Sequence, residues 1–377
     1  MSTTAPAPTS APTPDPALTG HPLSREARLV SSQRKIRLPF RLDDSMRFYS
    51  PQENVDSLAH PRVAAWLDFI ENTWAPDAAA GPAGAPRIAL LVPCCKMKPY
   101  LVSREHRAIN QALLDAGWVS TGTVPVPEGL AEAVDREADP ALFDASPLVR
   151  DGVVLDRFVV SEPLGMVPYE NVYHWNGEQS PATSYDDPGL FEARGTSVSP
   201  EHPLFTATPV AGGKYSWGPG ERQAYVAMHN RMAEVIAASL VRLAPYYAST
   251  AAWLSPGLTH RSFLAGTARR AEDGLAYSRR GVDGVELPLV GVGDLVPAEV
   301  GESITMMPTQ TQIAAAKEAL TARLAATGRA ATPGAMRAVF ARGDGHDTPL
   351  GLPEALVHLT AWLDEAAAAA GASGGES

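Results

Sequence analysis

The chain has 377 residues, of which 31 are Lys or Arg and 42 are Asp or Glu, and its formal net charge is −11. Hydrophobic residues make up 45% and charged residues 19%, which is typical of a folded globular protein and excludes a wholly disordered chain. The acidic balance disfavours non-specific binding to nucleic acid, because neutralisation of phosphates by Lys and Arg supplies most of that affinity. Any contact with RNA is therefore expected to be local.

The two cysteines, Cys94 and Cys95, are adjacent in the sequence. Neighbouring cysteines cannot easily form a normal disulfide or supply a four-ligand zinc site alone, so we expect no structural disulfide, no metal and no other cofactor. No apolar run reaches membrane-spanning length, and the N-terminus lacks the basic start and apolar block of a secretory signal. The sequence thus predicts a cytoplasmic protein without a membrane partner, and it does not indicate the oligomeric state.

The first 59 residues form two segments of different composition. Residues 1–22 are mainly Pro, Ala, Thr and Ser with almost no large apolar side chain, so we expect a disordered tail. Residues 23–59 form the most basic region, and its cationic residues are Arg25, Arg28, Arg34, Lys35, Arg37, Arg41 and Arg47. A solvated N-terminal arm explains this composition, and a patch facing phosphates is the alternative.

Residues 60–265 are expected to form an α/β core domain. His60 and Pro61 open a helix whose apolar residues follow the three and four spacing of one buried face. The apolar run at 87–92, RIALLV, follows a Gly/Pro linker and is typical of a strand buried on both faces of a sheet. Ser103 then suits the N-cap of a following helix. Together these signals predict a strand, a loop and a helix.

A second strand is expected at 153–160, VVLDRFVV, and it also leads into a Gly/Pro-rich loop, so that two loops share one sheet edge. Residues 175–220 have little periodicity and suggest a long surface excursion. A helix is expected over 221–243. Residues 266–377 are expected to be a mixed, mainly helical C-terminal region, with helices that begin near Thr309, Pro333 and Pro353. The predicted fold class is α/β: a parallel or mixed sheet flanked by helices, with a helical C-terminal extension.

The segment after the first strand, PCCKMKPYLVSREH, is dense in reactive side chains. In open α/β sheets, ligands bind at the carboxyl ends of the strands. Nearby lysines and a helix N-terminus favour the thiolate form of a cysteine, which makes Cys94 a candidate nucleophile. His106 is a candidate acid or base, and Tyr100 offers a hydroxyl donor. The alternative for each is structural, because a cysteine after a buried strand is often an inert core residue and Ser103 has a sufficient role as a helix cap.

The spacing of these residues resembles the signature of the archaeosine synthase core domain, a family related to the tRNA-guanine transglycosylases. That signature is Pro-Cys, three residues, Lys-Pro-Tyr, two residues, Ser, two residues and His, and it is matched here at Pro93, Cys94, Lys98, Pro99, Tyr100, Ser103 and His106. A later family segment, Ser-x-Pro-Leu-Gly-x-Val-Pro, is matched at Ser161, Pro163, Leu164, Gly165, Val167 and Pro168. Glu162 occupies its first variable position. A further Trp and Glu pair of the family corresponds to Trp217 and Glu221 if the long excursion is an insertion.

The resemblance implies an enzyme that adds an amine, such as lysine, to the nitrile of a 7-cyano-7-deazaguanine-type base. The base would be free, part of a nucleoside or part of tRNA, so the implied partners are a small deazapurine, an amine donor and, in the third case, tRNA. The implied catalytic residues are Cys94, Lys98, Tyr100 and His106. The implied substrate-binding residues are Pro93, Cys95, Ser103, Ser161, Pro163, Leu164, Gly165, Val167, Trp217 and Glu221. Direct addition and a covalent thioimidate on Cys94 are both consistent with the motif.

Two other functions fit the sequence. One is a non-catalytic subunit that binds a modified base within a tRNA or nucleoside modification system, which the complete set of motif residues disfavours. The other is an RNA-modification protein whose RNA footprint combines the basic arm with Arg269, Arg270, Arg279 and Arg280. Affinity that falls steeply with added salt would identify the second of these alternatives.

Overall fold

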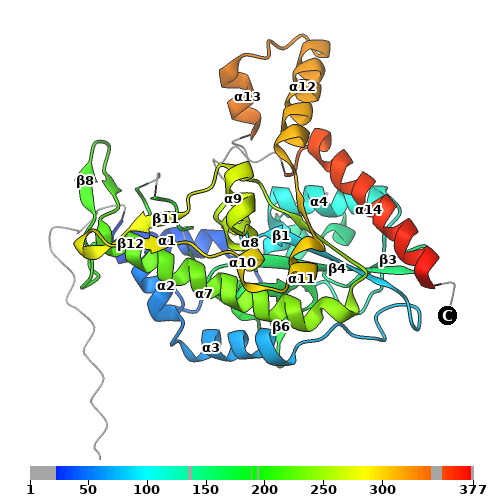
Figure 1. Cartoon of the computed structure of the whole chain (residues 1–377), viewed down its shortest axis with the longest axis horizontal. Helices are drawn as coiled ribbons and strands as arrows, with labels where there is room; N and C mark the ends of the chain where they lie inside the picture. Colours follow the sequence, from blue (N-terminus) through cyan, green and yellow to red (C-terminus); the bar gives the residue numbers. More distant parts are fainter. Residues whose placement is uncertain (1–22, 135–137, 188, 193–194, 341–349, 375–377) are drawn as a thin grey trace, which may run out of the picture.

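The computed structural model describes residues 23–134, 138–187, 189–192, 195–340 and 350–374 (Figure 1). The tail predicted for residues 1–22 lies outside this part of the chain. The core is a seven-stranded mixed sheet in the order β13-β10-β1-β4-β3-β2, with β5 paired to β4. Its strands are β1 (Arg87–Pro93), β2 (Val119–Ser120), β3 (Leu148–Arg150), β4 (Val153–Ser161), β5 (Gly165–Pro168), β10 (Ser249–Trp253) and β13 (Ile304–Met307). The expected α/β class is confirmed.

The middle of the sheet is parallel. β1 pairs in parallel with β4 on one side and with β10 on the other, and β10 pairs in parallel with β13. β3 and β5 run antiparallel to β4. All seven residues of β1 and all nine of β4 are buried, as expected for strands covered on both faces, and those of β4 include Asp156 and Arg157. Because β1, β4 and β10 run the same way, their carboxyl ends lie at one edge of the sheet.

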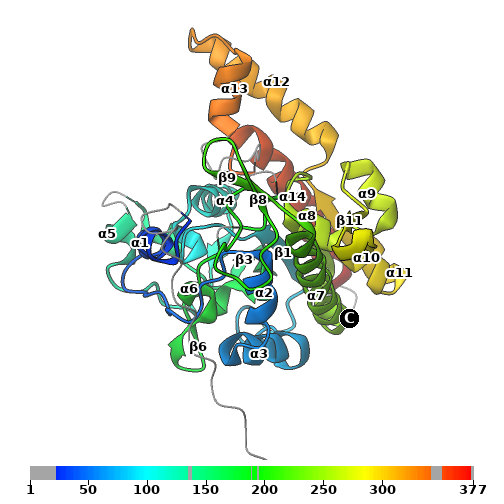
Figure 2. The ribbon, with the colours of Figure 1, turned by 90° about the vertical axis from the view of Figure 1, so that its left-hand side faces the viewer.

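Helices cover the sheet and extend beyond it. Two long helices pack close to the strands: α14 contacts β1, β4 and β10, and α7 contacts β5. In both views α12 and α13 project away from the sheet (Figures 1 and 2). The α-helices are α1 (Arg25–Lys35), α2 (Pro51–Ser57), α3 (Pro61–Asp68), α4 (Arg104–Asp115), α5 (Leu130–Val134), α6 (Pro181–Ser184), α7 (Pro219–Leu243), α8 (Thr259–Leu264), α9 (Thr267–Asp273), α10 (Val292–Leu295), α11 (Ala298–Glu302), α12 (Gln310–Ala326), α13 (Pro333–Phe340) and α14 (Pro353–Gly374).

The helix starts follow the capping signals in the sequence. His60 is the N-cap of α3, with Pro61 at the first helical position, and a π-helical turn, Phe69–Thr73, continues that helix. The Ser103 side chain caps α4, and the Thr309 side chain caps α12. The excursion predicted at 175–220 contains short hairpins and little other regular structure. Among the described residues, the separate two-stranded sheets are β6 (His174–Trp175) with β7 (Glu178–Gln179), β8 (Thr208–Val210) with β9 (Lys214–Ser216), and β11 (Ser278–Arg280) with β12 (Glu286–Pro288).

The N-terminal segment packs into the protein, in contrast to the solvated arm expected from its charge. Phe40, Met46 and Phe48 are all buried in the main hydrophobic core. The buried Arg28 donates hydrogen bonds to the backbone oxygens of Tyr49 and Thr196. Apolar residues spaced between the arginines therefore outweigh the basic composition that suggested an arm.

The region after residue 265 contributes to the same sheet as the core domain. β13 pairs with β10, and α14 packs across the middle strands. The boundary expected at 265 therefore does not separate two sheets. Within the described residues, none of the helices has the length and apolar character needed to cross a bilayer.

Candidate active site

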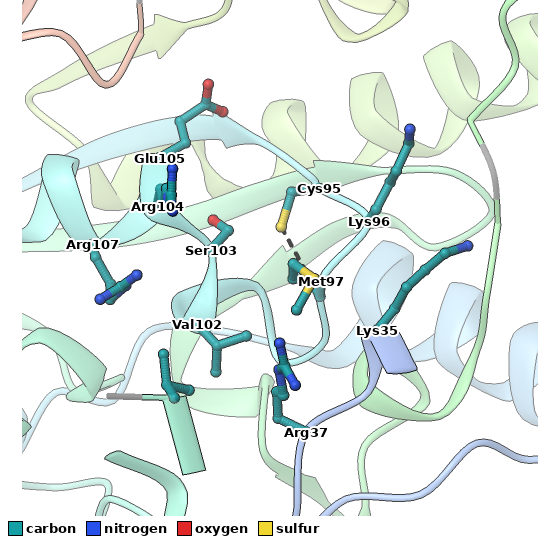
Figure 3. Close-up of a pocket in the computed structure, with 11 residues that line it drawn as sticks. Lys35, Arg37, Cys95, Lys96, Met97, Val102, Ser103, Arg104, Glu105 and Arg107 are labelled. Carbon is teal, nitrogen blue, oxygen red and sulfur yellow. Dashed lines mark hydrogen bonds between the residues drawn. The ribbon is translucent and has the colours of Figure 1, made fainter. Parts of the chain in front are cut away.

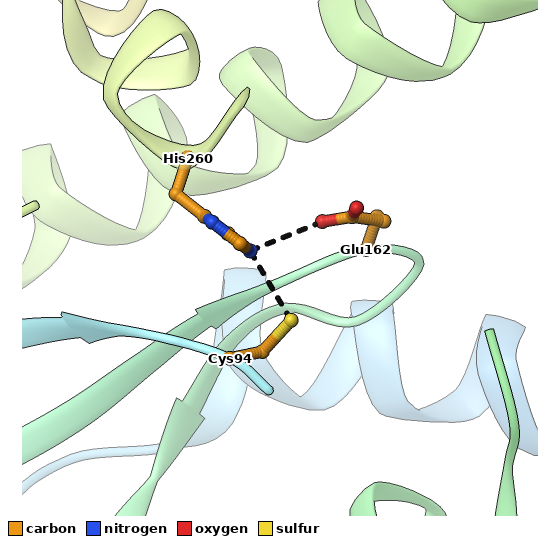
Figure 4. Close-up of side chains that lie close together, drawn as sticks. All are labelled: Cys94, Glu162 and His260. Carbon is orange, nitrogen blue, oxygen red and sulfur yellow. Dashed lines mark hydrogen bonds and ion pairs between the residues drawn. The ribbon is translucent and has the colours of Figure 1, made fainter. Parts of the chain in front are cut away.

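Three strands deliver three reactive side chains to one point at the sheet edge. Cys94 follows β1 directly, Glu162 follows β4, and His260 lies in α8, which comes after β10. The Cys94 Sγ atom is 3.1 Å from His260 Nε2, and the same nitrogen is 3.4 Å from Glu162 Oε2 (Figure 4). Glu162 and His260 are buried, whereas Cys94 is partly exposed. Cys94 is thus the most exposed member of the cluster.

The charges of this cluster depend on one another. Burial alone would lower the pKa of His260, but Cys94 and Glu162 outweigh it and hold the pKa well above its usual range. Burial would raise the pKa of Glu162, but His260 overcomes that effect and lowers it. His260 is therefore an imidazolium and Glu162 a carboxylate at neutral pH. The Cys94 sulfur thus lies beside a cationic imidazole, an arrangement suited to cysteine nucleophiles.

The arrangement is not a linear relay of acid, imidazole and thiol. Cys94 and Glu162 both approach Nε2, while Nδ1 of His260 is buried and has no hydrogen-bond partner among the described residues. The sulfur, nitrogen and carboxylate oxygen all lie within 4.8 Å of one another. Such a set of three donors can also hold an ion such as Zn²⁺ with its fourth position open. The cluster can therefore act as an activated thiolate or as a three-ligand metal site.

A buried group of hydroxyls and one ammonium lies behind Cys94. The hydroxyls of Tyr100, Ser161 and Tyr185 form a triangle with O–O distances of 3.1, 3.0 and 2.6 Å. Lys98 Nζ lies 4.8 Å from the ring centre of Tyr100 and 4.6 Å from that of Tyr185, and it donates a hydrogen bond to the Cys95 carbonyl at 2.5 Å. These contacts fix the loop after β1 against the end of β4.

Burial sets the protonation of this group as well. Loss of solvent raises the pKa of Tyr100 and of Tyr185 well above the usual value, so both phenols stay protonated and can donate. Burial, with Glu162 as a further cause, also raises the pKa of Asp187 well above the usual range. Asp187 Oδ1 accepts from the backbone N–H of Gly189 at 2.5 Å, and its Oδ2 is buried with no partner among the described residues. Lys98 and Tyr100, which the motif predicts as site residues, therefore lie close to Cys94 in the same loop.

His106 has a structural role, because both of its ring nitrogens are hydrogen-bonded inside the protein. Its Nε2 is 2.9 Å from the Pro93 carbonyl, its Nδ1 is 2.6 Å from the Tyr169 hydroxyl, and its side chain is fully buried. Burial lowers the pKa of His106 to about 4, so the ring is neutral, Nε2–H donates to the carbonyl and Nδ1 accepts from Tyr169. Both nitrogens are occupied, and the imidazole next to Cys94 belongs to His260. His106 instead fixes the residue that precedes Cys94.

The other motif residues around Cys94 also have internal partners. The Ser103 hydroxyl accepts from the His106 backbone N–H at 3.1 Å and so caps α4. The buried Cys95 thiol contacts the backbone oxygens of Met97, at 3.3 Å, and Tyr100, at 3.7 Å. Pro93 contributes the carbonyl held by His106. These contacts hold the backbone of the loop around Cys94 in place.

The second motif segment forms a tight turn between β4 and β5. Ser161, Pro163, Leu164 and Val167 are all buried. Gly165 has φ +67°, and a Cβ atom there would lie 2.6 Å from Val235 Cγ1. Only glycine fits both the backbone angle and the close approach of α7. This geometry gives Gly165 the role of a structural turn between the two strands.

Trp217 and Glu221 lie at the start of α7. Glu221 caps that helix, accepting from the Gly218 backbone N–H at 3.0 Å and from the Thr206 backbone N–H at 2.9 Å. Trp217 donates from Nε1 to the Ser197 carbonyl at 2.9 Å. Its indole also lines a cavity of about 560 Å³ that includes Thr259, the neighbour of His260. Trp217 therefore borders a space beside the site, whereas Glu221 has a structural role.

Sequence reasoning missed His260 and undervalued Glu162. The signal for His260 was present, because the segment STAAWLSPGLTH repeats the pattern of a strand, a Gly/Pro loop and a reactive residue near a helix start. Before Trp253 the residues of this strand are small or polar, which makes the strand hard to recognise. Comparisons with protein-family models, with curated proteins and with solved structures found no match for this chain.

Proposed function

We propose that this protein is an enzyme that adds an amine to the nitrile carbon of a 7-cyano-7-deazaguanine-type base through a thioimidate on Cys94. The observation that carries the proposal is the 3.1 Å contact between Cys94 Sγ and His260 Nε2, beside the Glu162 carboxylate. The resemblance of the two motif segments to the archaeosine synthase core domain supplies the substrate class. The geometry favours the covalent route because it pairs a thiol with an imidazolium.

The first step uses the thiolate form of Cys94 and the cationic His260. The Cys94 thiolate attacks the nitrile carbon and forms a C–S bond while one π bond of the nitrile breaks. The nitrile nitrogen takes the proton from His260 Nε2, so the product is a neutral thioimidate and a neutral imidazole. The Glu162 carboxylate keeps the imidazolium in place before this transfer.

In the second step the amine attacks the thioimidate carbon and forms a C–N bond. His260 takes the proton that the amine loses, and the C–S bond breaks so that Cys94 leaves as a thiolate. The product is an amidine, and the thiolate and imidazolium are restored. Atoms and charges balance without an oxidant or reductant. The buried network of Lys98, Tyr100 and Tyr185 keeps the loop in position through both steps.

The test is to incubate the purified protein with 7-cyano-7-deazaguanine, with and without lysine, and to measure intact-protein and product masses. Without lysine we expect a covalent adduct equal to the mass of the base, which peptide mapping assigns to Cys94 and not to Cys95. With lysine we expect the amidine product. Cys94→Ala should form no adduct, and turnover at the wild-type rate in that variant would reject the covalent role.

The role of His260 is tested by His260→Gln, with His174→Gln as the matched control because His174 is exposed. Loss of a positioned acid and base should lower turnover by about 10² to 10⁴ fold in the first variant and leave the second unchanged. A non-catalytic base-binding module would instead bind the base without adduct or product. That result would replace the enzyme with the binding alternative.

A further inference from the structure

A cavity lined by cations lies beside the loop that carries Cys94. Its volume is about 410 Å³, and its walls come from the end of α1, the loop after β1 and the first turn of α4 (Figure 3). The cationic lining residues are Lys35, Arg37, Lys96, Arg104 and Arg107. Glu105 is the one carboxylate among the lining residues that the structure describes. A protein with a net charge of −11 thus gathers positive charge at one place.

Three of these cations have no counter-ion among the residues that the structure describes. Within the described part of the chain, the guanidinium groups of Arg37, Arg104 and Arg107 make no hydrogen bond or ion pair, and Arg107 Nε is buried without a partner. Lys35, in contrast, is paired with Asp186 at 3.0 Å. Positive groups held together without a partner repel one another, and a buried N–H without an acceptor costs free energy. A bound anion would remove both costs.

The shape and chemistry of the cavity favour phosphate. Arginine presents a planar set of N–H donors that matches the oxygens of a phosphate group. The N-terminal turn of α4, whose Ser103 cap lines the same cavity, adds a favourable dipole for an anion. The five cationic residues line one cavity of about 410 Å³, which is large enough for a phosphate group.

We propose that this cavity binds the phosphate monoester of a nucleotide. Cys95 and Lys96 line the cavity and directly follow Cys94, so one loop borders both the phosphate position and the nucleophile. The phosphate is then part of the substrate, and the base to be modified arrives as a 5′-nucleotide. The assignment of the phosphate to the substrate rests on the proposed function, whereas the binding of phosphate itself does not.

The experiment is a calorimetric titration of the full chain with inorganic phosphate, guanosine and guanosine 5′-monophosphate. The variants are Arg104→Gln with Arg107→Gln, and Arg329→Gln as the matched control, because Arg329 is exposed and far along the chain. We expect the monophosphate to bind at least about tenfold more tightly than guanosine. The double variant should lose that gain and the control should keep it, and circular dichroism checks that both variants are folded.

The outcomes separate this inference from the proposed function. Equal affinity for guanosine and its monophosphate, or an unchanged gain in the double variant, would overturn the phosphate site even if Cys94 forms its adduct. Failure of the adduct test leaves the titration readable. Tight binding of a tRNA-sized RNA, lost in the double variant and falling with salt at a log–log slope steeper than about −2, would assign the cavity to an RNA backbone and overturn the nucleotide proposal.

Discussion

Replacing His106 should reduce the loss of unfolding free energy that this protein suffers as the pH falls from 7 toward 4. Burial lowers the pKa of His106 from 6.5 to about 4, so an unfolded chain binds a proton between these values that the folded chain does not. The stability contributed by the neutral ring is therefore complete above pH 6.5 and is lost as the pH falls toward 4. A shift of this size corresponds to about 3 kcal/mol of unfolding free energy.

The assay is urea unfolding at pH 7 and pH 4.5, followed by the fluorescence of the seven tryptophans. His106→Gln should lower the unfolding free energy at pH 7 by about 1 to 3 kcal/mol, because the bonds to Pro93 and Tyr169 are lost. The difference between the two pH values should shrink by about 2 to 3 kcal/mol. The exposed His174→Gln is the control, and an equal pH dependence in wild type and His106→Gln would refute the reasoning.

Three further predictions concern the cluster around Cys94. Glu162→Gln removes a carboxylate that raises the pKa of His260, so the alkaline limb of kcat/KM should move to lower pH, and an unmoved limb would contradict this. Zn²⁺ should inhibit turnover by binding the Cys94 sulfur, and EDTA should restore the turnover. Activity that requires zinc would show that Cys94 is a metal ligand and not a nucleophile. Lys98→Met should lower kcat at least about tenfold while the melting temperature changes by only a few degrees, because an apolar side chain can fill a buried cation's place; kinetics equal to wild type would remove Lys98 from the site.

Much of the fold was predictable because its signals are local. β1 and β4 are rich in apolar residues, and α4 and α12 begin at side-chain caps that the sequence displays. β10 was missed because its residues, STAAW, are small or polar until the final tryptophan. The packing of the basic segment at 23–59 was missed because charge dominated its composition, while a few apolar residues decide where a segment lies.

The sequence predicted Cys94 as a site residue but not His260, and the strand order explains why. His260 is 166 residues away from Cys94, and only the pairing of β10 with β1 brings them together. No local pattern states which strands become neighbours, so the sequence predicts the nearest histidine, His106, as the candidate acid or base. The structure gives His106 the task of holding Pro93, the last residue of β1.

The motif residues mainly shape the loop around Cys94, and the residues that contact its thiol lie elsewhere in the sequence. Several motif residues form a frame: Ser103 caps α4, His106 fixes the Pro93 carbonyl, and Lys98 donates to the Cys95 carbonyl. Each of these bonds constrains the backbone on one side or the other of Cys94. The groups that complete the cluster with the thiol, His260 and Glu162, lie outside the motif's fixed positions. A chain that kept the motif and lost His260 would therefore keep the shape of the loop and lose its chemistry, and this makes His260, more than any motif residue except Cys94, the position on which the proposed activity depends.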